Sequence, residues 1–205
     1  MAVTDGRQAR RHELRREMIL RAAAEEFALQ GFVNATLDRI GERIGLSKAS
    51  LYYYVNSKEE LLAVILEQVT SRIAEEAAQV EGSAEERLRA FVRAHVTVGA
   101  TSVEGQVLGE NVNVLLDREA HERFARARQK HEQRLAALIH EGVEAGEFRS
   151  LPVGPAVKLM FGALNSIPVW FRPDGRLTLE QLADEVVGWM LEGLAGPPTD
   201  PHSTT

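Results

Sequence analysis

Residues 36–61 read TLDRIGERIGLSKASLYYYVNSKEEL, and this stretch determines how the rest of the chain is interpreted. It predicts two short helices and the start of a third. Thr36 is a favourable N-cap residue, and the apolar residues after it recur at the spacing of one helical face, namely Leu37, Ile40 and Ile44. Gly45 tolerates the left-handed conformation at which such a helix ends. The first helix is therefore expected to stop there.

The second predicted helix follows the tight turn at Gly45-Leu46, where Ser47 can act as its N-cap. Only Leu51 in this helix is plainly a core residue. Its other face offers a cation, small side chains, hydroxyls and phenols, which suits a helix that enters the DNA major groove. The spacing alone leaves another interpretation open, because helical hairpins that bind nothing also contain short helices with a polar face.

The third predicted helix opens with Ser57-Lys58-Glu59-Glu60, which is a capping box. The free N–H groups at the start of this helix, together with Lys58, could hold a phosphate. Apolar residues then continue at helical spacing to about Val80, so the helix is expected to exceed twenty residues. Such a helix can act as a lever between two parts of a protein, or it can be inert scaffolding.

The stretch also resembles the N-terminal domain of the TetR family of transcriptional regulators, over roughly residues 12–65. The residues that carry the resemblance are Gly31-Phe32, Thr36, Ile40, Gly45-Leu46-Ser47, Leu51-Tyr52-Tyr53 and Ser57-Lys58-Glu59-Glu60-Leu61. The resemblance implies an all-α, TetR-like fold in which a three-helix helix-turn-helix domain precedes a larger helical ligand-binding and dimerisation domain. It also implies DNA contacts: bases or nearby phosphates for Ser47, Lys48, Ala49, Ser50 and Tyr53, and the DNA backbone for Thr36, Tyr52 and Lys58.

Two groups of residues depart from the family's pattern. Gly41 and Ile44 stand where small alanines are usual, and this pair is expected to open the helix packing slightly. Residues 54–56 read Tyr-Val-Asn where the family often has His, Phe and Lys. One backbone-binding cation is therefore absent from this sequence.

Composition and charge agree with a DNA-binding protein. The chain has 205 residues, is 44% hydrophobic and contains no cysteine, so it can bury a sizeable core without disulfides. It has neither a signal-like apolar run nor 18 consecutive apolar residues, which predicts a soluble, cytoplasmic protein without membrane contact. The net charge is −6, yet residues 1–58 hold 10 Lys and Arg against 7 Asp and Glu. The basic end of the chain is thus where DNA would bind.

We divide the chain into four segments from these patterns. Residues 1–11 are predicted to be a flexible basic arm, and residues 12–58 a helix-turn-helix DNA-binding domain with its reading motif at 36–55. Residues 59–195 are predicted to be a helical ligand-binding and dimerisation domain, and residues 196–205 a disordered, proline-containing tail.

The last two predicted helices indicate a homodimer. Residues 152–171 are apolar nearly all round, and residues 178–194 carry a wide, continuous apolar stripe. A helix without a polar face must be covered on two sides, which a four-helix interface between two subunits would achieve. The predicted interface residues are Leu164, Leu182, Val186 and Met190.

Polar residues on otherwise apolar helices are the only sequence signal for a small-molecule ligand. Each needs a partner when buried, and that partner is either another side chain or a ligand. Together with nearby aromatic residues they predict a largely apolar pocket with a few orienting contacts. The predicted pocket residues are Phe91, His95, Asn111, Asn113, Phe124, His131, Phe161, Asn165 and Trp170. Residues 170–175 also resemble relatives that respond to lipid or steroid acyl thioesters, which implies an effector of that kind.

Enzymatic motifs are incomplete. His121-Glu122 and His131-Glu132 each begin a zinc-protease-like motif, but Ala125 and Leu135 stand where the second histidine is required. The sequence has no glycine-rich phosphate loop and no Gly-x-Ser-x-Gly elbow. We therefore predict no catalytic residue, no metal site and no cofactor.

These patterns predict a homodimeric transcriptional regulator that binds a near-palindromic double-stranded DNA operator. Repression, relieved by a small and mostly apolar effector, is the expected mode. Two alternatives remain open: an effector-independent, architectural DNA-binding protein that recruits a protein partner through its C-terminal domain, and a helical enzyme.

Overall fold

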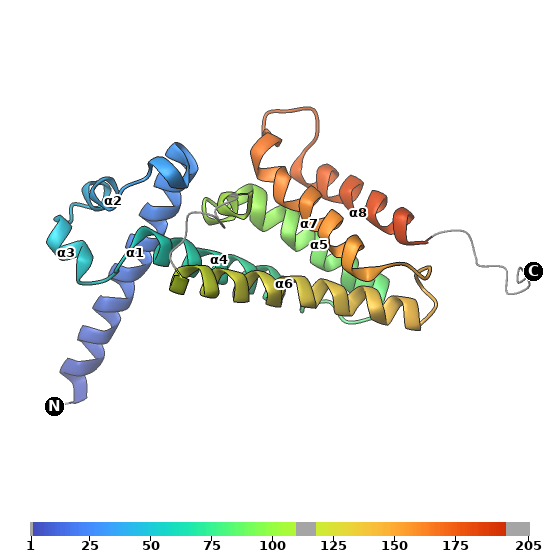
Figure 1. The fold of residues 1–205 in the computed structure, drawn as a ribbon, viewed down its shortest axis with the longest axis horizontal. Coiled ribbons are helices and arrows are strands. Elements are labelled where there is room, and N and C mark those ends of the chain that lie inside the picture. Colours follow the sequence, from blue (N-terminus) through green and yellow to red (C-terminus); the bar gives the residue numbers. More distant parts are fainter. Residues whose placement is uncertain (1, 110–117, 196–205) are drawn as a thin grey trace, which may run out of the picture. The chain divides into compact units, whose positions relative to one another are not determined.

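The computed structural model describes residues 2–109 and 118–195, and all of their regular structure is helical (Figure 1). The prediction of an all-α fold is confirmed. The elements in chain order are α1 (Ala2–Asn34), α2 (Leu37–Arg43), α3 (Lys48–Tyr52), α4 (Lys58–Ala77), α5 (Ala84–Thr101), the 3-10 helix η1 (Glu104–Gly109), α6 (Arg118–Glu144), α7 (Val153–Trp170) and α8 (Leu179–Ala195). No helix in these ranges combines the length and the apolar character needed to cross a membrane.

Two compact units make up the chain. The first comprises Met1–Val69 and Ser102–Ala127, and the second comprises Thr70–Thr101 and Arg128–Thr205. The sequence-based boundary at residue 58 was placed at the end of the helix-turn-helix motif. The boundary between the compact units is set by packing and lies within α4, between Val69 and Thr70. The start of α4 therefore falls in the first unit, and α4 and α6 each contribute residues to both units.

Helix α1 begins at Ala2, so the segment that the sequence predicted to be a flexible basic arm is helical from residue 2 to residue 11. This segment contains no proline and several residues that favour helix. Gly31 interrupts α1 with φ 72° and ψ 154°, a positive-φ conformation that suits glycine. The core of the first unit is formed by Ile19, Ala23, Phe27, Phe32, Ile40, Leu51, Leu62 and Ile65.

The turn between α2 and α3 depends on Gly41 as well as on Gly45. The Leu46 amide donates to the Gly41 carbonyl at 2.9 Å. A Cβ atom on Gly41 would lie 2.8 Å from the Leu46 carbonyl oxygen, which is closer than such atoms approach. Gly41, which is unusual for the family, therefore permits the backbone at Leu46 to approach closely. The sequence alone did not reveal this reason for a glycine at position 41.

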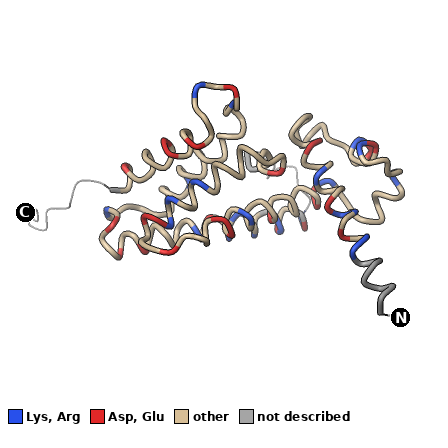
Figure 2. Tube along the Cα trace, turned by 180° about the vertical axis from the view of Figure 1, so that it is seen from behind, with Lys and Arg blue, Asp and Glu red and all other residues tan. Residues whose placement is uncertain are grey.

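The second unit is built around α5, which packs against α7 and α8. Its core contains Leu88, Phe91, Val92, Leu135, Ile139, Val157, Leu164 and Val187. Acidic and basic residues are both spread along α6, whereas α7 carries Lys158 as its single charge (Figure 2). Helix α6 therefore has a charged face, whereas the exposed face of α7 is largely apolar.

Candidate nucleic-acid interface and buried polar site

Helix α3 has one buried anchor and an otherwise exposed surface. Leu51 is completely buried, which fixes the helix on the core of the first unit. Ser47 caps the helix, because its Oγ accepts from the Ser50 amide at 3.2 Å. The remaining residues that the sequence predicted to face DNA are exposed, namely Lys48, Ala49, Ser50, Tyr52 and Tyr53. Tyr53 is 76% exposed, which is unusual for a large aromatic residue.

Lys48 already has an acidic neighbour. Its Nζ donates to Asp38 Oδ2 at 3.0 Å, and both side chains are exposed. This hydrogen bond raises the pKa of Lys48, so the ammonium is charged at physiological pH. Exposed ion pairs contribute little stability and exchange readily, so a phosphate can replace the Asp38 carboxylate.

Helix α1 contributes a residue to the same surface. The His12 ring lies 5.0 Å from the Tyr54 ring and 6.3 Å from the Tyr53 ring, and the two tyrosine rings lie 5.1 Å apart. These edge and tilted contacts restrict the orientation of Tyr53 beside α3. The sequence analysis missed His12, because no local pattern connects residues 12 and 53.

Lys58 has a role that the sequence did not predict. Its Nζ donates to three carbonyl oxygens at the end of α1, those of Phe32 at 2.8 Å, Val33 at 3.0 Å and Ala35 at 3.0 Å. It also lies 4.7 Å from the centre of the Phe32 ring. An ammonium group has three N–H donors, so all of them are occupied here. The predicted phosphate contact of Lys58 would require these bonds to break.

Thr36 and Glu26 hold α2 in place. Thr36 is exposed, and its Oγ1 accepts from the Arg39 amide at 3.3 Å, as an N-cap does. Glu26 on α1 is only 3% exposed, and its carboxylate lies 2.9 Å from Arg43 Nε and 3.5 Å from Arg39. This buried carboxylate connects α1 to both ends of α2. Sequence reasoning did not identify it, because a buried glutamate cannot be distinguished locally from an exposed one.

Five of the residues predicted to line a ligand pocket come together in the second unit: Phe91, His95, His131, Phe161 and Asn165. His95 and His131 are 1% and 4% exposed. His95 Nε2 lies 3.1 Å from Asn165 Oδ1, and His95 Nδ1 lies 3.2 Å from His131 Nε2. The His131 ring is flanked by Phe91 at 5.1 Å and by Phe161 at 4.9 Å, measured between ring centres.

The other predicted pocket residues are not in this cluster. Asn111 and Asn113 lie outside the described residues, and so does the side chain of Phe124. Trp170 lies outside the cluster: its ring is half-exposed at the end of α7, where Nε1 donates to Ser166 Oγ at 3.1 Å. Helix α7 is apolar nearly all round, so its sequence does not reveal which aromatic residues face inward.

Both buried histidines are neutral. Burial lowers the pKa of His95 to about 4, although its hydrogen bond with Asn165 acts in the opposite direction. Burial also lowers the pKa of His131 to about 3. Electrostatic repulsion from His95, when His95 is protonated, and from Arg134 lowers it further. The cluster is therefore an uncharged polar site within aromatic surroundings.

The free energy of unfolding should fall as the pH is lowered from 7 to 5. Both folded-state pKa values lie below the ordinary value of 6.5. Between these values the unfolded chain binds protons that the folded chain does not, so acid favours unfolding. We expect about 2 kcal/mol for each histidine over this range. Urea denaturation at pH 7, 6 and 5 measures the effect.

The control compares two histidines of α6. His131→Phe should remove about half of the pH dependence, whereas His140→Phe should keep it, because His140 is exposed. Equal pH dependence in wild type and His131→Phe would contradict the assignment of a neutral, buried His131.

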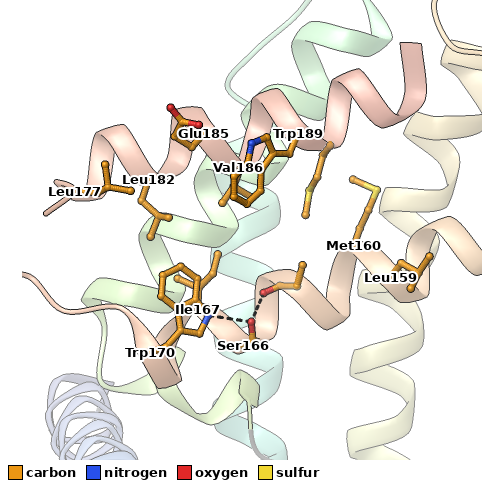
Figure 3. Close-up of a pocket in the computed structure, with 12 residues that line it drawn as sticks. Leu159, Met160, Ser166, Ile167, Trp170, Leu177, Leu182, Glu185, Val186 and Trp189 are labelled. Atoms are coloured by element: carbon orange, nitrogen blue, oxygen red, sulfur yellow. Dashed lines mark hydrogen bonds between the residues drawn. The ribbon is translucent and has the colours of Figure 1, made fainter. Parts of the chain in front are cut away.

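An apolar groove runs between α7 and α8 (Figure 3). It encloses about 590 Å³, and its lining is almost entirely apolar, from Leu159, Met160, Ala163, Ser166, Ile167, Trp170, Leu177, Leu182, Glu185, Val186, Trp189 and Met190. Trp189 is 71% exposed and Leu159 is 75% exposed. Exposed apolar surface of this extent is typical of a protein–protein interface.

The predicted dimer residues divide between this groove and the core. Leu182, Val186 and Met190 line the groove. Leu164 is 1% exposed and belongs to the core of its own unit, so it offers no surface to a partner. The sequence analysis missed Leu159 and Trp189, which are the most exposed of the large apolar lining residues.

Comparisons with known proteins agree with this arrangement. The family model described as "Bacterial regulatory proteins, tetR family" matches residues 19–65, and the model described as "Tetracyclin repressor-like, C-terminal domain" matches residues 81–194. The HTH-type transcriptional repressor KstR2 of Rhodococcus jostii (strain RHA1) is 26% identical over 200 residues, which cover 95% of this chain and 95% of KstR2.

Two solved structures are similar over most of their length. The structure of AibR in complex with isovaleryl coenzyme A and operator DNA is 27% identical, with a TM-score of 0.76 over 85% of this chain and 97% of AibR. The TetR family transcriptional regulator PfmR from Thermus thermophilus is 29% identical, with a TM-score of 0.73 over 85% of this chain and 97% of PfmR.

Proposed function

Because this chain belongs to the TetR family and is a DNA-binding transcriptional regulator, we propose that it represses transcription as a homodimer on a near-palindromic operator and that a small, mostly apolar effector releases it. KstR2 is named a transcriptional repressor, which supports repression rather than activation. We propose that it acts in the cytoplasm, where the operator DNA is. Its matched relatives are regulators, so we propose no catalytic activity.

The observation that carries the DNA-binding role is the exposed side of α3. One buried leucine holds the helix, while a charged lysine, small side chains and two exposed tyrosines are left for DNA. Hydroxyls and a cation can contact both base edges and phosphates. We propose Ser47, Lys48, Ala49, Ser50 and Tyr53 as the base-proximal residues, with Thr36 and Tyr52 at the DNA backbone.

A dimer is needed for this surface to recognise a palindrome. Two copies related by a two-fold axis present two recognition helices to half-sites about 34–36 Å apart. The apolar groove between α7 and α8 is the described surface best suited to join two copies, because it is large, apolar and exposed. We propose it as the homodimer interface.

The effector is proposed to bind the helical domain that follows the first part of α4. AibR was solved with isovaleryl coenzyme A and operator DNA, which supports an acyl thioester or another lipid-like effector. Helix α4 runs without a break from Lys58 to Ala77 and so connects the DNA-binding unit covalently to the second unit. An effector that binds the DNA-incompatible state more tightly would shift the population away from the operator.

Two α3 variants test the DNA-binding role. Lys48→Ala and Tyr53→Ala should each weaken operator binding about tenfold with the dimer intact, because each removes one phosphate or base contact. Fluorescence anisotropy with a duplex selected from random DNA by the wild-type protein measures the affinity. Lys48→Ala should also reduce the slope of log affinity against log salt by about 1.

The matched control is Lys130→Ala, which removes an exposed lysine from α6 in the second unit. It should leave both the affinity and the salt slope unchanged. Unchanged affinity in both α3 variants would reject α3 as the recognition helix. Operator binding that no acyl thioester or lipid alters would favour the architectural alternative.

A further inference from the structure

Two histidines and an asparagine form a directional chain of hydrogen bonds in the second unit. Asn165 presents Oδ1 to His95 Nε2 at 3.1 Å, and this oxygen can only accept. Nε2 of His95 must therefore carry a hydrogen. Because His95 is neutral, its Nδ1 carries none and must accept from His131 Nε2 at 3.2 Å. The amide oxygen thus determines the tautomer of both imidazoles.

The last atom of this series of hydrogen bonds, Nδ1 of His131, lacks a partner. Since Nε2 of His131 carries the hydrogen, Nδ1 of the neutral ring has a free lone pair. This atom is buried and makes no hydrogen bond within the part of the chain that the structure describes. A buried polar atom without a partner is costly, and the surrounding Phe91 and Phe161 rings cannot supply a donor.

We propose that the effector donates an O–H or N–H hydrogen to Nδ1 of His131, and that the part of the effector that contacts this atom is uncharged and apolar. The inference rests on the proposed function, because it specifies the chemistry of the ligand that releases the operator. Flanking aromatic rings match an apolar body, and the lone pair matches a single donor group.

The surroundings oppose charged ligands at this atom. A cationic donor would be desolvated among aromatic rings and would lie near Arg134, one turn farther along α6. A carboxylate has no hydrogen to donate. It could bind if His131 took up a proton, or if the Asn165 amide rotated and both imidazoles exchanged tautomers, because in either case Nδ1 would become a donor.

The imidazole ¹⁵N resonances of the full-length protein without ligand test which nitrogen of each histidine carries the hydrogen. Long-range ¹H–¹⁵N spectra distinguish an unprotonated imidazole nitrogen from a protonated one. We expect Nδ1 of His131 to be unprotonated and Nε2 to be protonated, with assignment by comparison with His131→Phe. A protonated Nδ1 would reverse the chain, require an acceptor instead of a donor, and overturn the proposal.

Three naphthalene probes test the ligand class. 2-Naphthol has one O–H donor, 2-methoxynaphthalene has the same body without the donor, and 2-naphthoate has a charged acceptor. We expect 2-naphthol to shift the Nδ1 resonance and to bind about tenfold more tightly than its methyl ether, which is the ratio expected for one buried hydrogen bond. Stronger binding of 2-naphthoate, or no shift with 2-naphthol at its solubility limit, would overturn the proposal.

Variants of His131 and Asn165 test whether the preference for a hydrogen-bond donor depends on these hydrogen-bonded residues. In His131→Phe the ratio of the two affinities should fall from about ten to about one, because the ring packing is kept and the acceptor is lost. His140→Phe, a change of an exposed histidine on the same helix, should keep the ratio. If His131→Phe does not fold, Asn165→Leu serves instead, since losing the amide frees both tautomers and should lower the ratio. An unchanged ratio in the folded variant would overturn the proposal.

The two hypotheses fail separately. If the donor preference holds but no ligand releases operator DNA, the site at His131 stands and the proposed effector mechanism is wrong. If ligands release DNA while His131→Phe keeps the donor preference, the proposed function stands and the assignment to His131 is wrong.

Discussion

Trp189→Glu should convert the dimer into monomers and abolish operator binding at concentrations that saturate the wild type. Trp189 is 71% exposed and lines the α7–α8 groove, so its indole is available to a partner. Buried tryptophans at interfaces typically contribute about 2–4 kcal/mol, and two-fold symmetry applies the loss twice. We therefore expect the dimer dissociation constant to rise by about 10³-fold or more.

Sedimentation equilibrium measures the dissociation constant, and anisotropy measures operator binding on the same samples. The matched control is Leu29→Glu, which puts the same charge on a 65% exposed apolar residue of α1, in the other compact unit. This control should remain dimeric. A dimer of wild-type affinity in Trp189→Glu would show that the groove is not the subunit interface.

The helix-turn-helix elements could be predicted from the sequence because their determinants are local. Thr36, Gly45 and Ser47 set helix ends through their own backbone and side-chain chemistry. The structure has α2 between Thr36 and Gly45, and α3 begins directly after Ser47. Leu51 was identifiable as the anchor because it is the single aliphatic residue of α3 larger than alanine. Signals of this kind need no knowledge of the rest of the fold.

The interface and the buried polar site depend on non-local packing. Leu164 and Leu159 lie on the same apolar helix, yet one is buried and the other is 75% exposed. Hydropathy does not separate them, because the difference arises from which side of α7 faces α5. The pairing of His95 with His131 is equally hidden from the sequence. Each is a polar residue on an apolar helix face, and the hydrogen bond between them joins two different helices.

Lys58 shows that a local motif does not reveal partners that are distant in the sequence. A lysine beside a helix N-terminus is a common phosphate ligand, and its sequence neighbours favour that interpretation. The carbonyl groups that occupy it belong to the end of α1 and the residue after it, more than twenty residues earlier in the chain. Carbonyl groups at a helix C-terminus attract cations, and the end of α1 contains no basic residue of its own.

Lys58→Met should therefore destabilise the protein in the absence of DNA. Methionine has a side chain of similar length, but it leaves three carbonyl oxygens without their donor and removes the cation beside the Phe32 ring. Hydrogen bonds to a charged group contribute about 1.5–3 kcal/mol each, and partial access of water to the carbonyls reduces the sum. We expect the free energy of unfolding to fall by about 2–4 kcal/mol, measured by urea denaturation without DNA.

The matched control is Lys48→Met, which removes a lysine whose ion pair with Asp38 is exposed. Its urea midpoint should equal that of the wild type, while its operator affinity should fall. The two lysines would thus have opposite profiles: Lys58 acts on stability, and Lys48 acts on DNA binding. If Lys58→Met kept wild-type stability and lost only operator affinity, the contacts with α1 would be incidental, and the phosphate-binding role predicted from the sequence would be correct.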